Sequence, residues 1–280
     1  MEEPLSQDRR NFLKKIAAGT VSATVLLVYK QYANAEDAAD PVSAAISGSA
    51  GATGDKQPDW AYVIQVDKCI GSGDCVRACS AENDVPSGMF RTWVERFIKT
   101  DEGIYVDSPN GGIEGFPEVD DEIAAAATEA WYVPKMCNHC HEPPCVPVCP
   151  TGASYQREND NLVLVDQDKC IGCHSCVVAC PYQVRFIPGN ARGYYGKHKT
   201  PYEDVSYRGW QVGTAQKCTL CVHRIDEGLE PACVETCPTK TLVFGDLNDP
   251  DSEISELIRK RESFQPRAEL GTDPCVFYLT

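Results

Sequence analysis

Apolar residues along this chain gather in short runs that polar stretches separate. Residues 62–66, 90–98 and 162–165 either alternate between apolar and polar positions or are largely apolar, and residues 242–244 are wholly apolar. Runs as short as these are typical of β-strands. The chain is therefore expected to hold several short strands joined by long loops.

One amphipathic helix is predicted near the C-terminal end. Ile254, Leu257 and Ile258 recur at helical spacing, so they form a single apolar stripe. The preceding pair Asp249-Pro250 is expected to cap this helix, which should end near residue 261.

Two polar stretches are expected to be insertions. Gly111-Gly112 and the acidic residues 118–122 indicate a surface insertion. Residues 188–207 form a longer one, which contains several tyrosines and basic side chains. An aromatic and basic loop on an acidic protein is a candidate docking surface, although an ordinary solvated loop could have the same composition.

The N-terminal region is expected to be a targeting segment. Arg9 and Arg10 precede an apolar stretch at residues 16–29, and Ala33-Asn34-Ala35 offers a cleavage site. This pattern predicts a twin-arginine signal peptide over residues 1–35 and a periplasmic location. The alternative is a chance arginine pair before a membrane anchor, but the apolar stretch is shorter than the roughly 20 residues that a spanning helix needs.

Composition limits the possible classes of protein. The chain has 280 residues, 42% of them hydrophobic, which indicates a folded protein. Its formal net charge of −15 argues against a nucleic-acid partner, because phosphate binding needs a basic surface. Residues 36–59 are rich in alanine, glycine and serine and are expected to be a flexible leader, with the folded part at 60–280.

The most informative stretch is residues 170–181, Cys-Ile-Gly-Cys-His-Ser-Cys-Val-Val-Ala-Cys-Pro. In bacterial iron–sulfur proteins this spacing lets three cysteines bind one cluster while the fourth binds a second cluster. Gly172 permits a tight backbone path, and Pro181 turns the chain away after the fourth cysteine. The stretch therefore predicts iron–sulfur clusters.

The same motif occurs earlier in the chain. Residues 67–79 match residues 168–180 at a constant offset of 101, except that Ser72 stands where the later copy has Cys173. A cluster at the first copy would have three of the usual thiolates. It is expected to be a three-iron cluster, or a four-iron cluster with Ser72, another side chain or water on the fourth iron.

A second motif also occurs twice. Residues 137–149 carry cysteines with gaps of two, four and three residues, and residues 218–237 repeat this pattern with the middle gap widened to eleven. The four motifs use fifteen of the sixteen cysteines, and Cys275 is expected to be a small buried apolar residue. Three histidines lie between the cysteines and are expected to tune the clusters rather than to ligate them: His139, His141 and His174.

Other uses of the cysteines are disfavoured. Export and an even cysteine count would permit disulfides, and Cys-x2-Cys pairs occur in structural zinc sites. Neither explains three close cysteines followed by a fourth and a proline. The chain also lacks a Ser-His-Asp set, a phosphate-binding loop and a dinucleotide fingerprint, so no catalytic site for an organic substrate is expected on it.

The four motifs, together with Arg91-Thr92-Trp93 and residues 245–252 and 271–279, resemble the four-cluster iron–sulfur subunits of the dimethyl sulfoxide reductase family. That family includes the beta subunits of polysulfide, tetrathionate, thiosulfate and arsenate reductases. The resemblance implies an α+β fold of two bacterial-ferredoxin-like dicluster units, with insertions and a C-terminal extension. Sequence alone would equally allow the first motif to pair with the second.

The resemblance also implies which side chains bind which cluster. The implied ligand sets are Cys69, Cys75 and Cys237 beside Ser72; Cys79, Cys218, Cys221 and Cys233; Cys137, Cys140, Cys145 and Cys180; and Cys149, Cys170, Cys173 and Cys176. Three sets would hold [4Fe-4S] clusters. The set beside Ser72 would hold a [3Fe-4S] or an atypically ligated [4Fe-4S] cluster.

The implied function is electron transfer between a molybdenum or tungsten pterin catalytic subunit and an integral membrane subunit that reacts with quinone. One alternative is an exported carrier that serves a multihaem cytochrome nitrite reductase system. A second alternative, of a different class, is a zinc-bound or disulfide-linked interaction scaffold.

Overall fold

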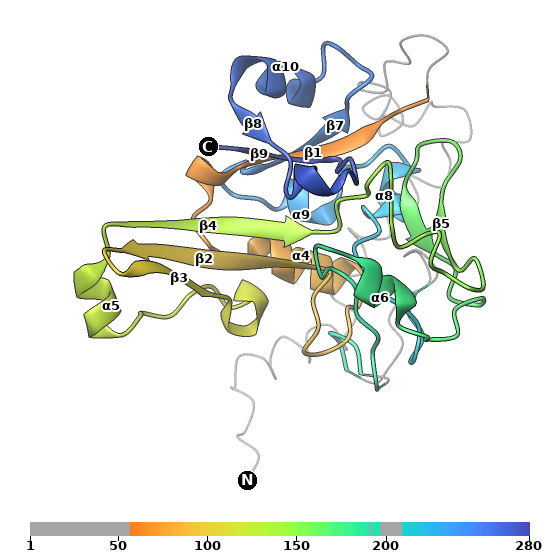
Figure 1. The fold of residues 1–280 in the computed structure, drawn as a ribbon, viewed down its shortest axis with the longest axis horizontal. Helices are drawn as coiled ribbons and strands as arrows, with labels where there is room; N and C mark the ends of the chain where they lie inside the picture. Colours follow the sequence, from red (N-terminus) through yellow and green to blue (C-terminus); the bar gives the residue numbers. More distant parts are fainter. Residues whose placement is uncertain (1–56, 191, 197–208) are drawn as a thin grey trace, which may run out of the picture. The chain divides into compact units, whose positions relative to one another are not determined.

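The computed structural model describes residues 57–190, 192–196 and 209–280 (Figure 1). The expected signal peptide, most of the leader and most of the 188–207 loop lie outside the described residues. Residues 57–59, which the sequence assigned to the leader, belong to the fold: the Asp59 N–H donates to the Asp246 carboxylate at 2.8 Å.

A four-stranded sheet joins segments that are far apart in sequence. Its order is β7-β1-β9-β8, with β1 at Trp60–Gln65, β7 at Leu242–Asp246, β9 at Val276–Leu279 and β8 at Ser263–Phe264. β1 runs antiparallel to β7 and parallel to β9. Since β1 leads into the first cysteine motif and β7 follows the fourth, these two motifs lie in one unit (Figure 1).

A two-stranded sheet organises the other two motifs. β5 at Ser154–Gln156 follows the second motif and pairs antiparallel with β6 at Val163–Val165, which precedes the third motif. The second motif therefore lies with the third. This is the pairing that the family resemblance implies, and the alternative pairing of the first motif with the second is not observed.

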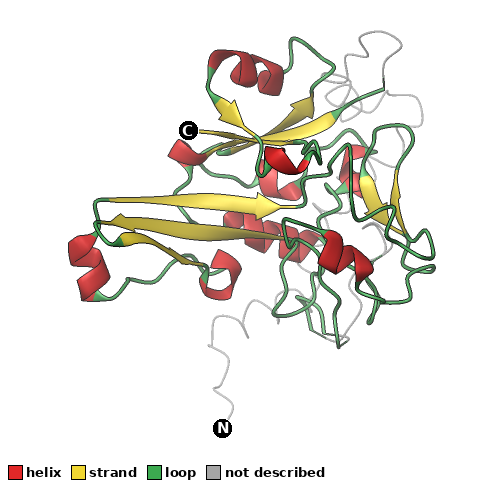
Figure 2. Cartoon of the chain, in the orientation of Figure 1, coloured by secondary structure: helices red, strands yellow, loops and turns green. Residues whose placement is uncertain are grey.

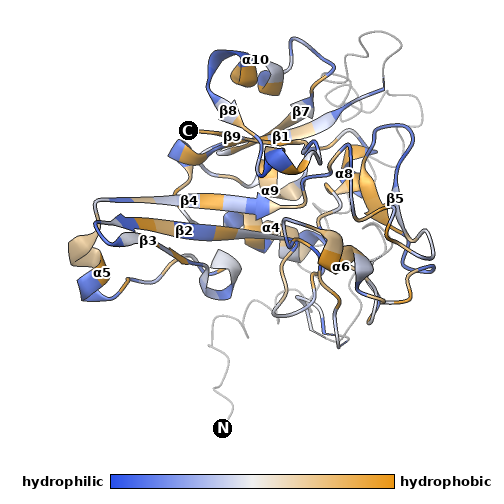
Figure 3. Ribbon diagram, in the orientation of Figure 1, coloured by the Kyte–Doolittle hydropathy of each residue, from blue (hydrophilic) through white to orange (hydrophobic). Residues whose placement is uncertain are grey.

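The residues that separate the first motif from the second along the chain form a third sheet (Figure 2). β2 at Thr92–Thr100 lies between β3 at Gly103–Asp107 and β4 at Glu129–Met136, and the short helix α5 at Asp121–Ala126 precedes β4. Only β2 was predicted. Its side chains alternate between buried and partly exposed positions over most of its length, with hydrophilic and hydrophobic stretches along it (Figure 3), whereas β3 is largely exposed and gives no amphipathic signal.

Part of this region was wrongly expected to be at the surface. Gly111 and Gly112 are buried in a 3-10 turn at Pro109–Gly112. A Cβ added to Gly73, in the first cysteine motif, would lie 2.2 Å from the Gly112 carbonyl oxygen. The insertion therefore packs against the loop that holds Ser72.

The helices near the cysteines are short. They are α4 at Asp74–Glu82, α6 at Ser175–Ala179, α8 at Val222–Ile225 and α9 at Ala232–Glu235. Two further 3-10 turns cover Val66–Lys68 and Ala268–Leu270. Within the described ranges, no helix is long and apolar enough to cross a membrane.

The predicted C-terminal helix is α10 at Glu253–Lys260. Its cap was assigned wrongly: the hydroxyl oxygen of Ser252, not Asp249-Pro250, accepts the Ser255 N–H at 3.3 Å. The apolar stripe is confirmed, because Ile254 is fully buried and packs with Leu257 and the strands of the four-stranded sheet.

Candidate iron–sulfur centres

The cysteines of the four motifs converge into separate groups. All sixteen cysteines lie among the described residues, and each carries a free thiol. Three of the groups line hollows, which we name here by one member. The Ser72 hollow (about 300 Å³) is lined by Ser72, Cys69, Cys75 and Cys237; the Cys180 hollow (about 310 Å³) by Cys137, Cys140, Cys145 and Cys180; and the Cys173 hollow (about 330 Å³) by Cys149, Cys170, Cys173 and Cys176.

The remaining four cysteines of the motifs form a buried group, here called the Cys233 set: Cys79, Cys218, Cys221 and Cys233. Burial raises the pKa of the Cys233 thiol, and the neighbouring thiols of Cys221 and Cys79 raise it further. Burial and the Cys221 thiol raise the pKa of Cys218 to about 12. Thiolates at these positions therefore need positive charge beside them, which bound iron would supply.

Backbone N–H groups point at several of these sulfurs. The Ser154 N–H lies 3.3 Å from Cys149 Sγ, and the Ala215 N–H lies 3.3 Å from Cys170 Sγ. Within the Cys233 set, the Tyr62 hydroxyl lies 3.5 Å from Cys233 Sγ. Hydrogen bonds to cluster sulfur raise the potential of a cluster. The loops thus present the kind of donors that an anionic cluster would use.

The Cys-x2-Cys segments share a backbone conformation. The residue before the second cysteine, or before Ser72, has positive φ in all four motifs: 68° at Gly71, 43° at His139, 66° at Gly172 and 60° at Leu220. Gly172 is also closely packed, because a Cβ there would lie 2.3 Å from the Gly213 carbonyl oxygen. The sequence pointed to glycine for this tight backbone path, as at Gly172. His139 and Leu220 adopt the same left-handed conformation although they carry side chains.

Ser72 lies in a loop with the same backbone path as the loop of Cys173. Besides the matching glycines, the next residue is left-handed in both copies, with φ of 77° at Gly73 and 64° at His174. The Ser72 hydroxyl oxygen accepts the Asp74 N–H at 3.4 Å, at the start of α4. Thus the structure puts a hydroxyl beside three thiols, at the position where the other copy has its fourth thiol.

Two of the three histidines contact cysteine loops. His139 is buried: its Nδ1 accepts the Val163 N–H at 3.2 Å, and its Nε2 lies 3.1 Å from the Cys218 carbonyl oxygen. Burial and the nearby Lys217 cation hold its pKa well below the usual range, so the ring is neutral and binds the backbone of a cysteine in the Cys233 set. His174 is exposed and bonds its own loop.

The third histidine and the sixteenth cysteine contact each other outside the four sulfur groups. His141 does not reach the hollow beside it, because its ring contacts the carboxylates of Asp59 and Asp273. Cys275 is buried as expected, but its thiol donates to the His139 carbonyl oxygen at 3.1 Å and is therefore not a purely apolar group.

Four cationic side chains of the described residues are buried. Arg96 pairs with Asp107, whereas three others were not anticipated from the sequence: Arg91, Arg185 and Lys217. Arg185 Nη2 donates to Cys145 Sγ at 2.9 Å and to the Ser154 hydroxyl at 3.0 Å. None of the three forms a salt bridge with a carboxylate of the described residues. Arg91 Nε and Arg185 Nη1 are buried with no hydrogen-bond partner there. Buried unpaired donors cost free energy, and anionic clusters beside them would offset it.

Nothing in the local sequence distinguishes these cations. Arg185 lies between two apolar residues and Lys217 directly precedes a motif cysteine, but Lys68 and Lys169, which also precede motif cysteines, are exposed. Only the folded arrangement reveals that they lie among sulfur groups. The charge and donors present therefore fit iron–sulfur clusters at the Cys173 hollow, the Cys180 hollow and the Cys233 set, and the three thiols beside Ser72 fit one by ligand type.

Known proteins share these features. Two models of the 4Fe-4S dicluster domain match the chain, one at residues 68–153 and the other at 128–195 and 195–247, so together they span all four motifs. One subunit of the tetrathionate reductase from Salmonella typhimurium is 39% identical over 79% of this chain and 72% of its own. The arsenate respiratory reductase iron-sulfur subunit ArrB of a Shewanella species is 37% identical over 78% of this chain and 94% of its own. Protein NrfC of Escherichia coli is 36% identical over 84% of this chain and 89% of its own.

Proposed function

Because this chain belongs to the iron–sulfur electron-transfer subunits of the dimethyl sulfoxide reductase family, we propose that it connects a molybdenum or tungsten pterin catalytic subunit to a quinone-reactive membrane subunit. Four clusters would be held by the three hollows and the Cys233 set. When bound, they supply one-electron redox centres. The polypeptide holds them in order, limits water around them and adjusts their potentials.

The observation that carries this proposal is the contiguous order of the four sulfur groups. Arg185 lies beside both Cys145 of the Cys180 hollow and Cys176 of the Cys173 hollow. Lys217 lies beside both Cys137 of the Cys180 hollow and Cys218 of the Cys233 set. The groups thus follow one another without a gap over this part of the series.

The last step in the series runs along α4. Cys75 belongs to the Ser72 hollow and Cys79 to the Cys233 set, and residues four apart on a helix lie on the same face. The order is therefore Cys173 hollow, Cys180 hollow, Cys233 set and Ser72 hollow. A series of this kind has two ends, which suits a subunit that connects two partners.

Exposed apolar side chains occur beside both ends. Ile171 is 68% exposed and Val178 is 84% exposed next to the cysteines of the Cys173 hollow, and Ile70 is 60% exposed next to Cys69. Large apolar residues exposed close together are typical of protein–protein contacts. In our proposal each end meets one partner subunit, so that these residues become covered.

Iron and sulfide analysis tests the cluster number. Protein purified without oxygen should contain about 15 or 16 iron atoms per chain, depending on the type of cluster beside Ser72. Acid-labile sulfide well below about three clusters' worth would contradict the four-cluster proposal. A colourless, iron-free and folded protein would favour the zinc or disulfide scaffold instead.

Isolation of the native complex tests the partners. We expect a large pterin-containing subunit and a membrane subunit to co-purify with this chain. Co-purification with a multihaem cytochrome, and without pterin, would favour the alternative of a carrier for a nitrite reductase system.

Export by the twin-arginine route completes the proposal. Its signal, Arg9-Arg10, lies outside the described residues and rests on the sequence. Replacing both arginines with lysine should leave the folded, cluster-containing protein in the cytoplasm, as measured by cell fractionation. Unchanged export of that variant would contradict this route.

A further inference from the structure

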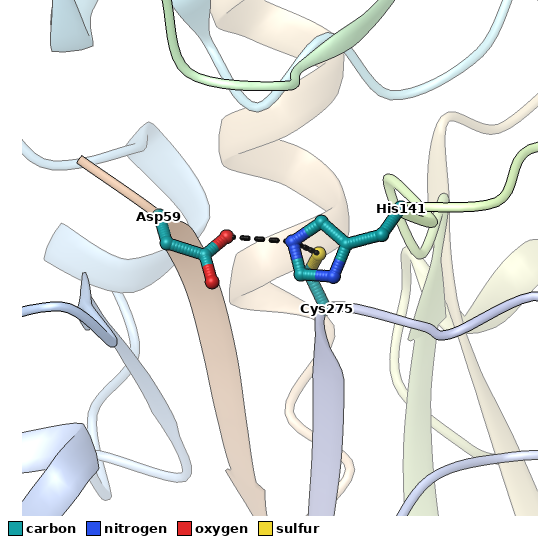
Figure 4. Close-up of side chains that lie close together, drawn as sticks. All are labelled: Asp59, His141 and Cys275. Atoms are coloured by element: carbon teal, nitrogen blue, oxygen red, sulfur yellow. Dashed lines mark hydrogen bonds and ion pairs between the residues drawn. The ribbon is translucent and has the colours of Figure 1, made fainter. Parts of the chain in front are cut away.

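A group of possible metal ligands lies outside the four sulfur groups. Asp59, His141 and Cys275 each offer one ligand atom, and these three atoms lie within 4.8 Å of one another. The Asp59 carboxylate is 2.7 Å from His141 Nε2, and Cys275 Sγ is 3.5 Å from the same nitrogen (Figure 4). Asp59 directly precedes β1, His141 lies in the second cysteine motif and Cys275 directly precedes β9, so only the fold brings them together.

The histidine ring is oriented as a metal ligand would be. His141 Nδ1 lies 2.9 Å from a carboxylate oxygen of Asp273, which leaves Nε2 facing Asp59 and Cys275. Histidines that bind metals usually donate their other ring N–H to a carboxylate or a carbonyl, which fixes the tautomer and the ring orientation. The backbone supports this arrangement, because the His141 N–H donates to the Asp273 carbonyl oxygen at 2.8 Å.

Cys275 is held equally firmly. Its N–H donates to the Asn138 carbonyl oxygen at 2.8 Å, and its thiol donates to the His139 carbonyl oxygen at 3.1 Å. The cysteine and the histidine are therefore positioned before any ion binds. Such preorganisation lowers the ordering cost of binding.

The spacing suits a tetrahedral ion of the zinc class. With a zinc–nitrogen distance of about 2.0 Å and a zinc–sulfur distance of about 2.3 Å, tetrahedral angles separate the two ligand atoms by about 3.5 Å. The distance between His141 Nε2 and Cys275 Sγ is 3.5 Å. The Asp59 oxygen would have to move from 2.7 Å to about 3.3 Å from Nε2, which a carboxylate can do by rotating.

We propose that Asp59, His141 and Cys275 bind one divalent cation of the zinc class. Sulfur, imidazole and carboxylate together favour zinc over magnesium or calcium. The side chains of His141 and Asp59 are 28% and 21% exposed, so an ion can enter and water can take the fourth position. Binding displaces the protons from Nε2 and from the thiol to solvent. The ion fastens β1 and β9 to the second cysteine motif and carries no electrons.

Metal analysis of the cluster-loaded protein tests the proposal. Protein purified without oxygen is incubated with zinc sulfate and passed over a desalting column, and zinc and iron are then counted per chain. We expect one zinc with unchanged iron. X-ray absorption at the zinc edge should show one sulfur at about 2.3 Å and nitrogen or oxygen ligands at about 2.0 Å.

Cys275→Ser and Asp59→Asn should each lower zinc affinity at least tenfold without loss of iron. Asp251→Asn, an exposed aspartate in a turn before α10, is the matched control and should retain zinc. Asp273→Asn should weaken binding while keeping the sulfur signal, since it acts only by orienting His141. The proposal is overturned if the loaded wild-type protein retains no zinc, if Cys275→Ser retains it undiminished, or if zinc enters only as iron is lost.

Discussion

Arg185 should raise the potentials of the two clusters that it separates. It is buried, it donates to Cys145 Sγ at 2.9 Å, and it also neighbours Cys176 of the Cys173 hollow. Burial alone would lower the pKa of the Arg185 guanidinium, but the Cys145 and Cys137 sulfurs raise it. The residue is therefore a permanent positive charge, which stabilises the reduced form of a cluster more than the oxidised form. Removing that charge in Arg185→Met should lower both potentials.

The size of the effect follows from Coulomb's law. An electron added to a cluster beyond Cys145 Sγ would lie roughly 6 to 7 Å from the guanidinium. At an effective dielectric constant of about 20, two unit charges at that distance interact by about 2.5 kcal/mol. For a one-electron couple this corresponds to about 100 mV. The lost hydrogen bond to sulfur acts in the same direction.

Redox titration followed by EPR measures this shift. Arg185→Lys keeps the charge and should restore most of the potential, whereas Arg185→Met should not. Arg259→Met, which removes an exposed arginine on α10, is the control and should leave all potentials unchanged. The reasoning is refuted if Arg185→Met retains its iron and shifts no potential by more than about 30 mV, a threefold change in a one-electron equilibrium.

Three further outcomes are expected. Ser72→Cys should convert a three-iron EPR signal of the oxidised protein into a four-iron one, and an unchanged spectrum would count against a three-iron centre. Gly172→Ala should lower the iron content by about one cluster, because the new Cβ would lie 2.3 Å from the Gly213 carbonyl oxygen and φ is 66°. Full iron retention would show that this loop can adjust. Ile254→Ala should destabilise the protein by about 2 to 4 kcal/mol in urea unfolding, because Ile254 is fully buried. Leu257→Ala, at a partly buried position on the same stripe, should cost less.

The cysteine groups were predictable because the number of residues between neighbouring cysteines is itself characteristic of iron–sulfur ligands. The residue before the second ligand position has a left-handed conformation in the first segment of all four motifs, and the offset of 101 residues identified Ser72 as the exception. The pairing of the motifs was not local. It depends on β1 pairing with β7 about 180 residues later, so the sequence alone left two arrangements open.

The structure adds residues whose role depends on distant neighbours. β3 is exposed along most of its length, so its sequence lacks the periodicity that a half-buried strand shows. Asp59 lies at the end of a segment whose composition predicts a flexible leader, yet its carboxylate contacts His141 across 82 residues. No sequence window contains either relationship.

The buried cations are unevenly distributed along the series of sulfur groups. No lysine or arginine of the described residues lines the Ser72 hollow or the Cys173 hollow, whereas Arg185 lines the Cys180 hollow and Arg91 neighbours the sulfurs of the Cys233 set. A buried cation without a carboxylate partner is costly unless another anion lies beside it. Arg91, Arg185 and Lys217 therefore offset negative charge at the two central groups, and Arg185 also does so at Cys176 of the Cys173 hollow. No lysine or arginine of the described residues lies beside the sulfurs of the Ser72 hollow. If a partner subunit encloses this end as we propose, the potential of the Ser72 cluster should respond to assembly more than the potentials of the central clusters.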